Sequence, residues 1–267
     1  MKIGFLITAR LKSTRLPKKL MLTLNGYTVI ERVIQRAKQV VEPEKIILCT
    51  STKYQDYPLV KTAVENNIYY YNGDSNDVLQ RLMDAAKFFG LDYFIGITGD
   101  NPLFSIEYAK LIKEIIQKDP SLDYIYSSKL PIGLNIYGLK IKALETVCSV
   151  KKIIDTEIWG PLINRSEIFN VKEIDVDSNH IRENYRLTLD EKSDYELIKI
   201  IYEHYKKDQI LNISDIFYLM DDDRELSIKN SNVVQRKLDS STLEKIDNYY
   251  NNNKDHILKM KSNIYQT

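Results

Sequence analysis

The sequence contains few of the residues on which several common kinds of functional site depend. Its 267 residues include two cysteines and three histidines. Cys49 and Cys148 lie far apart and lack the short spacing of a metal site, and the apolar run around Cys49 predicts a buried core thiol. No serine or cysteine motif accompanies the histidines, so the sequence gives no support for a hydrolase triad. This composition favours a protein of the reducing cytoplasm.

Long apolar runs and an excess of charge are also absent. No apolar segment approaches the ~20 residues of a membrane-spanning helix, and the N-terminal residues show no signal-peptide pattern. Lysine and arginine number 38 against 37 aspartates and glutamates, which leaves a net charge of +1. An even charge balance gives no reason to expect nucleic acid or a membrane surface as a partner. Because 43% of the residues are apolar, the chain has enough hydrophobic material for a substantial core.

Strands and helices are expected to alternate over the first part of the chain. Short apolar runs precede longer stretches in which apolar residues recur at a helical period. Alternation at this pitch is typical of a doubly wound, mostly parallel α/β sheet, in which ligands bind at the carboxyl ends of the strands. The expected strands cover residues 2–8, 44–50, 68–71 and 93–97, and the expected helices cover residues 29–40, 57–65, 77–89 and 105–117.

The alternation breaks after residue 123. We interpret residues 1–230 as one domain with a small α+β insertion over about residues 124–180, where a second substrate and a dimer partner would bind. Residues 231–267 are polar and predict a helical or partly ordered tail outside the main core. In this half the expected strands cover residues 124–128, 134–139, 169–176 and 185–189, and the expected helices cover residues 156–164, 194–205 and 213–220, with Ser193 as an N-cap.

The loop after the first expected strand has an unusual charge pattern. Residues 8–19 read Thr-Ala-Arg-Leu-Lys-Ser-Thr-Arg-Leu-Pro-Lys-Lys, and these five cations precede Glu31, the first acidic residue of the chain. A loop of cations and small residues between a buried strand and a helix is suited to binding phosphates. A solvated basic loop without a ligand is the alternative interpretation.

Residues 9–19 resemble the Ala-Arg-x-x-Ser-x-Arg-Leu-Pro-x-Lys signature of the sugar-acid cytidylyltransferases, the CMP-Kdo and CMP-sialic acid synthetases. Within that family, the chain is most similar to the spore-coat polysaccharide (SpsF-type) branch. The agreement runs in order over about residues 1–230. The further matching stretches are Cys-Thr-Ser-Thr at 49–52, Asp-Val-Leu-Gln-Arg at 77–81, Ile-Thr-Gly-Asp-Asn-Pro-Leu at 97–103 and Arg-Leu-Thr-Leu-Asp at 186–190.

The resemblance implies a Rossmann-like sheet of the nucleotide-diphospho-sugar transferase type. It also implies transfer of CMP from CTP to an acidic sugar, nonulosonic or Kdo-like, with release of pyrophosphate for surface glycan biosynthesis. By this resemblance Asp100 and Asp190, each at the end of an expected strand, hold Mg²⁺, with Mn²⁺ as a substitute. Carboxylate oxygens are the ligands that Mg²⁺ prefers. Relatives are commonly homodimers, and we expect the same here.

The resemblance also assigns the nucleotide contacts. Negative charge moves onto the leaving pyrophosphate during nucleotidyl transfer, so cations of the loop stabilise the transition state. We expect Arg10, Lys19 and Asp100 to be catalytic, since no side chain is an obvious general base. Arg81, one turn into its helix, is expected to contact the base or ribose, and a plain surface arginine is the alternative. The nucleotide-binding residues implied are Ala9, Arg10, Ser13, Arg15, Lys19 and Arg81.

The sequence departs from the related branch on the acceptor side. The branch tends to have Gly-Leu-Asp-x-Glu where residues 133–137 read Gly-Leu-Asn-Ile-Tyr, so two acidic positions are neutral. We expect Asn135, Tyr137 and Trp159, the only tryptophan, to contact the acceptor, and a core role for Trp159 is equally compatible. The departure leaves open a phosphorylated sugar or alcohol as acceptor, which would give a CDP-linked product.

Two other functions remain compatible with the sequence. A glycosyltransferase on a similar sheet would need an Asp-x-Asp metal motif, which occurs only at residues 175–177, in an expected strand, and at residues 221–223, late in the chain. The second alternative is a binding protein that keeps the nucleotide-binding fold but catalyses no reaction. Measuring CTP binding with and without Asp100→Ala would separate that protein from a working enzyme.

Overall fold

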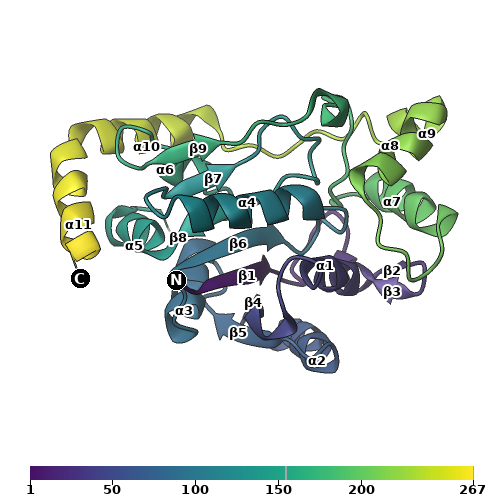
Figure 1. The fold of residues 1–267 in the computed structure, drawn as a ribbon, viewed down its shortest axis with the longest axis horizontal. Coiled ribbons are helices and arrows are strands. Elements are labelled where there is room, and N and C mark those ends of the chain that lie inside the picture. The colour runs from purple at the N-terminus through teal and green to yellow at the C-terminus, as the bar shows by residue number, and fades with distance from the viewer. Residues whose placement is uncertain (154, 267) are drawn as a thin grey trace.

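One seven-stranded sheet runs through the middle of the molecule and carries helices on both faces (Figure 1). The structure, a computed structural model, describes residues 1–153 and 155–266. In spatial order, the strands are β5 (Tyr69–Gly73), β4 (Ile46–Ser51), β1 (Ile3–Thr8), β6 (Tyr93–Thr98), β8 (Tyr137–Lys140), β7 (Tyr124–Tyr126) and β9 (Val171–Glu173). Strands β5, β4, β1 and β6 are parallel, whereas β8 is antiparallel to both β6 and β7. The prediction of a doubly wound, mostly parallel α/β fold is confirmed.

Two hydrophobic cores lie on opposite faces of the sheet. Neighbouring side chains of a strand point to opposite faces, so Phe5 and Ile7 of β1 enter one core and Leu6 enters the other. The first core is covered by α1 (Val29–Ala37), α2 (Tyr57–Glu65), α4 (Ile106–Lys118), α7 (Lys192–His204), α8 (Ile213–Asp222) and α9 (Arg224–Ile228). The second is covered by α3 (Val78–Phe88), α5 (Ile141–Val150), α6 (Gly160–Ile163), α10 (Ser240–Asn252) and α11 (Lys254–Gln266).

Short elements complete the chain. A hairpin of β2 (Thr23–Leu24) and β3 (Tyr27–Thr28) precedes α1, and 3-10 turns cover Lys19–Met21, Pro43–Lys45, Tyr54–Asp56 and Ser178–His180. None of the helices in the described part of the chain is long and apolar enough to cross a membrane.

The register of the central strands brings the ends of β1 and β6 together. Thr8 lies opposite Thr98, and the backbone N–H of Gly99 donates to the carbonyl oxygen of Thr8 across 2.8 Å. The loop that follows β1 therefore begins beside the segment that carries Asp100. Asp77 caps α3, because its carboxylate accepts a hydrogen bond from the N–H of Gln80.

The prediction of a strand over residues 185–189 is wrong. Arg186 makes a single isolated bridge to Ile132, and the segment lies outside the sheet. Its backbone donors are used elsewhere, since the N–H of Leu187 bonds to the carbonyl oxygen of Ile132. Gly133 permits this close approach. It has a φ of +101°, and a Cβ atom there would lie 2.2 Å from the backbone of Leu187.

Two predicted helix starts are also wrong. Helix α7 begins at Lys192 rather than after Ser193, because Glu191 is its N-cap and forms a capping box with Asp194. The helix expected over residues 156–164 is reduced to α6, which starts at Gly160. The Thr156 side chain instead accepts a hydrogen bond from the N–H of Leu79, so its segment is held against α3 in a non-helical form.

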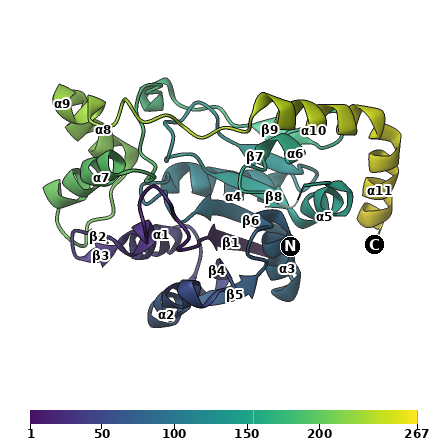
Figure 2. The ribbon, with the colours of Figure 1, turned by 180° about the vertical axis from the view of Figure 1, so that it is seen from behind.

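The polar C-terminal segment is helical, but our expectation that it lies outside the core is wrong. Seen from behind, α10 and α11 run along one end of the sheet beside α6 and α5 (Figure 2). Ile246, Tyr250 and Ile257 are buried in the second core. Lys261 and Tyr265 of α11 reach the buried carboxylate of Asp123 at 2.7 and 2.6 Å. Ile246, Tyr250 and Ile257 are enough to pack α10 and α11 against the second core, although the segment is polar as a whole.

Candidate active site

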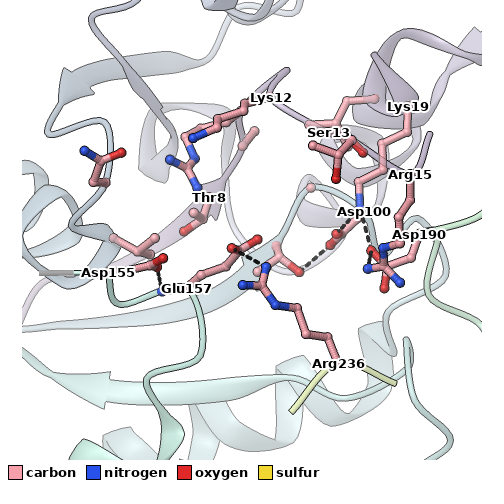
Figure 3. A pocket seen from close by; sticks show the side chains of 18 of the residues that line it. Thr8, Lys12, Ser13, Arg15, Lys19, Asp100, Asp155, Glu157, Asp190 and Arg236 are labelled. Carbon is pink, nitrogen blue, oxygen red and sulfur yellow. Dashed lines mark hydrogen bonds and ion pairs between the residues drawn. The ribbon is translucent and has the colours of Figure 1, made fainter. Parts of the chain in front are cut away.

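A cavity of about 300 Å³ opens at the carboxyl ends of β1 and β6 (Figure 3). The loop after β1 forms one wall, and segments near residues 76–81, 98–100, 155–159, 190 and 236 form the others. The lining residues are Thr8, Ala9, Arg10, Lys12, Ser13, Thr14, Arg15, Lys19, Leu20, Asn76, Val78, Arg81, Thr98, Gly99, Asp100, Asp155, Glu157, Trp159, Asp190 and Arg236. The structure thus brings together every residue that we expected at the nucleotide and the metal.

Buried contacts fix the loop after β1. The N–H of Ala9 donates to the carbonyl oxygen of Cys49 at 3.0 Å, which continues the pairing of β1 with β4. The N–H of Leu11 donates to the carboxylate of buried Asp56 at 2.6 Å, and Ser51 donates to the other oxygen of that carboxylate at 2.5 Å. Asp56 was missed from the sequence because it lies 45 residues from its partner. The loop is therefore held in shape before any ligand binds.

Lys19 joins the two predicted metal ligands. Its Nζ lies 2.6 Å from Oδ2 of Asp100 and 2.7 Å from Oδ1 of Asp190. Burial alone would lower the pKa of Lys19, but the two carboxylates outweigh it and raise that pKa. Burial alone would raise the pKa of Asp190, but the charge of Lys19, with further cations nearby, lowers it. Lys19 and Asp190 are therefore both charged at neutral pH.

Other loop cations surround this ion pair. Arg15 lies 3.3 Å from Asp190 and 3.3 Å from Glu191 through its two terminal nitrogens. Arg10 donates to the carbonyl oxygen of Ser75, in the segment before α3. The partners of Arg15 and Lys19 are carboxylates far along the chain, so folding neutralises charges that the local sequence leaves unbalanced.

A buried network holds the second oxygen of Asp190. Arg186 donates to Oδ2 of Asp190 at 3.0 Å and to the carboxylate of Asp194 at 2.9 and 3.2 Å. Asn230 donates to Asp194 at 2.7 Å and to the carbonyl oxygen of Arg186 at 2.9 Å. The Asp194 side chain is fully buried. No local sequence pattern indicates that Asp194 holds Arg186, because the two residues belong to different expected elements.

Arg81 has unpaired donors inside the cavity wall. Its side chain is fully buried, and one terminal nitrogen donates to the carbonyl oxygen of Asp74 at 2.5 Å. Its Nε and Nη2 groups have no hydrogen-bond partner among the described residues. Burial lowers the pKa of Arg81, and the charge of nearby Arg10 adds to this effect. A buried guanidinium with two free donors is costly unless a ligand completes it.

The predicted acceptor residues divide into two groups. Trp159 lines the cavity. Tyr137 does not line it but packs edge-on against Trp159, with ring centroids 4.9 Å apart. Asn135 donates its amide to the carbonyl oxygen of Ser127 at 2.8 Å, away from the cavity lining.

The two Asp-x-Asp patterns of a glycosyltransferase lie away from the cavity. Asp221 is paired with Arg182 at 2.7 Å, and Asp177 caps the 3-10 turn that follows it. The aspartates at the cavity fit a divalent metal better. Asp100 and Asp190 converge on one point, where the Lys19 ammonium stands as a cation, so a hard metal ion would meet two carboxylate oxygens there. Among the described residues no cluster supplies three protein ligands. The remaining ligands would be phosphate oxygens and water.

An enzyme that transfers a nucleotidyl group needs cations for a triphosphate and carboxylates for a metal in one cavity. This cavity supplies both on a doubly wound sheet, which places the protein among the α/β nucleotidyltransferases. The chain belongs to the cytidylyltransferase family, whose model matches residues 5–218. It is accordingly a CTP-dependent nucleotidyltransferase.

Individual relatives agree with this family. An uncharacterized protein of Methanocaldococcus jannaschii is 30% identical over 88% of this chain and 97% of its own. The spore coat polysaccharide biosynthesis protein SpsF of Bacillus subtilis is 25% identical over 82% of this chain and 93% of its own.

Solved structures show the same fold. A cytidylyltransferase from Leptospira borgpetersenii superposes with a TM-score of 0.79 and 24% identity, covering 89% of this chain and all of its own. A CMP:2-keto-3-deoxy-manno-octonic acid synthetase complexed with CTP superposes with a TM-score of 0.60 and 18% identity. The match covers 76% of this chain and 99% of that structure. A Mycobacterium tuberculosis protein of this fold, solved with manganese, superposes with a TM-score of 0.54 and 15% identity. The match covers 75% of this chain and 99% of that structure.

Proposed function

We propose that the protein transfers CMP from CTP to a hydroxyl group of an acidic sugar, nonulosonic or Kdo-like, and releases pyrophosphate. The observation that carries the proposal is the meeting of Lys19 with Asp100 and Asp190 beneath the basic loop. A product activated in this way would serve surface glycan biosynthesis, in line with the spore coat polysaccharide biosynthesis for which the relative SpsF is named. We also propose that the protein is a homodimer. Its oligomeric state can be measured by sedimentation velocity.

In this reaction the acceptor oxygen forms a bond to the α-phosphorus, and the bond between that phosphorus and the bridging α,β-oxygen breaks. Negative charge develops on the pyrophosphate, where Arg10, Arg15 and Lys19 stabilise it. Lys19 donates to a phosphate oxygen once the nucleotide competes with the two aspartates. The acceptor proton passes to solvent, because none of the described residues that line the cavity is a histidine. Mg²⁺, held by Asp100 and Asp190, would polarise the phosphate oxygens.

The choice of cytosine is attributed to Arg81. Cytosine presents two adjacent acceptors, O2 and N3, whereas uracil carries a hydrogen on N3. The free Nε and Nη2 donors of Arg81 match the cytosine pattern. With uracil, one of these buried donors would meet another donor and stay unpaired, which costs about 1–3 kcal/mol.

The test is pyrophosphate release from CTP with Mg²⁺, across a panel of sugar acids and phosphorylated alcohols. We expect release with at least one sugar acid, and a loss of 100-fold or more in Asp100→Asn and Lys19→Met. Lys53→Met is the matched control, because this lysine is exposed and outside the cavity lining. Release with phosphorylated alcohols alone would replace the sugar-acid acceptor by a CDP-linked product. No release with any acceptor would refute the transferase function for this chain.

A further inference from the structure

The cavity wall opposite the basic loop carries a different set of side chains (Figure 3). Asp155, Glu157 and Trp159 come from the segment between α5 and α6. Arg236 comes from the segment that joins α9 to α10, beyond the residues that match the family model. Two carboxylates, one indole ring and one guanidinium therefore face the space where a second substrate would meet the nucleotide.

Buried contacts fix the segment that carries the two carboxylates. Thr156 is fully buried and donates to Oδ1 of Asp77 at 2.9 Å, while it accepts from the N–H of Leu79 at 3.0 Å. Lys151 pairs with the other oxygen of Asp77. Because Asp77 caps α3, this wall is tied to the helix that carries Arg81. The segment of Asp155 and Glu157 is thus anchored on α3.

Two tyrosine rings pack against Trp159 and hold its indole ring in place. Its ring packs edge-on against Tyr137 at 4.9 Å and against Tyr124 at 6.0 Å between ring centroids. Only 9% of the residue is exposed, although it lines the cavity. A fixed aromatic edge among a few polar groups is a common way to orient the carbon skeleton of a small ligand.

Arg236 has donors available for an anion. Its Nη1 lies 3.1 Å from Oε2 of Glu157, and the two side chains are 62% and 53% exposed. An ion pair this exposed contributes little, typically below about 1 kcal/mol, so a ligand can compete for it. A guanidinium has five N–H donors in a planar fork, and this pair uses one of them. A carboxylate can bind the remaining donors in a bidentate manner.

We propose that Asp155, Glu157, Trp159 and Arg236 form the subsite for a polyhydroxylated carboxylic acid. Arg236 pairs with the carboxylate of the acid, the two acidic side chains accept hydrogen bonds from its hydroxyl groups, and Trp159 packs against its carbon skeleton. The subsite rests on the proposed function for the reaction that follows binding. Its own chemistry is that of binding alone, so it can be tested without turnover.

Trp159 is the only tryptophan of the chain, so its fluorescence reports binding at this wall directly. The full-length protein, loaded with a non-hydrolysable CTP analogue and Mg²⁺, is titrated with 3-deoxy-manno-octulosonate and with N-acetylneuraminate. We expect a saturable change with at least one acid. Arg236→Gln should raise the Kd at least tenfold and Arg236→Lys should raise it less, while Lys237→Gln, an exposed neighbour outside the cavity lining, should leave it unchanged.

The carboxamide of the same sugar supplies a second measurement on unaltered protein. It should bind to the wild type about as weakly as the acid binds to Arg236→Gln. Equal affinity of Arg236→Gln and wild type, equal affinity of acid and carboxamide, or no response to either acid would each overturn the subsite. A response that depends on Arg236 but leads to no pyrophosphate release with CTP would instead overturn the proposed function and leave the subsite intact.

Discussion

The backbone N–H of Leu189 donates a hydrogen bond to the carbonyl oxygen of Asp100 across 2.9 Å. This bond joins the segment that ends in Asp190 to the segment that carries the other predicted metal ligand. The two carboxylates consequently converge through the backbone, with no strand pairing between their segments. The fold thus holds the two backbone segments side by side, and Lys19 pairs with both carboxylates.

Asp194→Asn should weaken the site through Arg186. Removing the charge of fully buried Asp194 leaves Arg186 with Asp190 as its remaining carboxylate, and breaking a buried ion pair typically costs about 3–5 kcal/mol. We expect a comparable loss in the free energy of unfolding, measured by urea denaturation. We also expect a higher Mg²⁺ concentration for half-maximal pyrophosphate release, because Arg186 would draw Asp190 away from the metal.

Lys192→Gln is the control for this prediction, since that side chain lies on the same helix and is 85% exposed. An unchanged Mg²⁺ requirement in Asp194→Asn, with stability lost, would show that the network serves folding alone.

Arg81→Met should reduce the preference for CTP over UTP. The variant lacks both donors that match cytosine, so kcat/KM for CTP should fall about 10- to 100-fold, corresponding to the loss of a charged hydrogen bond. The value for UTP should change far less. Steady-state kinetics with both nucleotides measures the ratio, and Lys87→Gln, at the exposed end of the same helix, should preserve it. A ratio unchanged in Arg81→Met would remove Arg81 from base recognition.

Both cysteines should be unreactive in the folded protein near neutral pH. Burial raises the pKa of Cys49 and of Cys148 to about 12, so each stays a protonated thiol. Alkylation by iodoacetamide at about pH 8 should therefore require unfolding, which mass spectrometry can follow. The unfolded chain releases these protons near its ordinary pKa of about 8.5. The stability that the thiols contribute is thus complete below that pH and is lost as the pH rises towards about 12.

A smaller alkaline loss of stability in Cys49→Ser than in the wild type would support this account. Rapid alkylation of either thiol in folded protein would contradict it.

Ile257→Ala should destabilise the whole molecule. Ile257 is fully buried in the second core, and truncation of a buried isoleucine typically costs about 2–5 kcal/mol. Leu258→Ala is the control on the same helix, because that side chain is 38% exposed. Urea denaturation of both variants measures the difference. If Ile257→Ala were as stable as wild type, α11 would be only loosely attached.

Local patterns were sufficient to predict the central strands and helices. Residues 57–65 form a helix as expected, since apolar periodicity and length decide such elements. The alternating apolar residues of 185–189 also satisfy the strand pattern, but this segment joins no strand of the sheet and makes one isolated bridge to Ile132. Their backbone donors pair with Ile132 and Asp100, and only the tertiary structure determines this.

In the site, too, local motifs predict some residues, and tertiary contacts alone bring in the others. Its cations and two aspartates belong to motifs that a sequence displays, and the cavity contains them all. Asp56, Asn230 and Arg236 belong to no motif, because each acts on a partner dozens of residues away. On the acceptor side, Asn135 was predicted from its place in a motif, whereas its amide is used within the protein.

The segment between α9 and α10 has a practical consequence for anyone dividing this chain. Asn230 and Gln235 bond to Arg186, and Arg236 reaches the cavity. The two helices that follow then supply part of the second core. A recombinant fragment that stopped at the end of the family match would lose Arg236 from the cavity wall, two partners of Arg186 and part of the second core. The smallest unit that can be both stable and competent therefore extends well into α11.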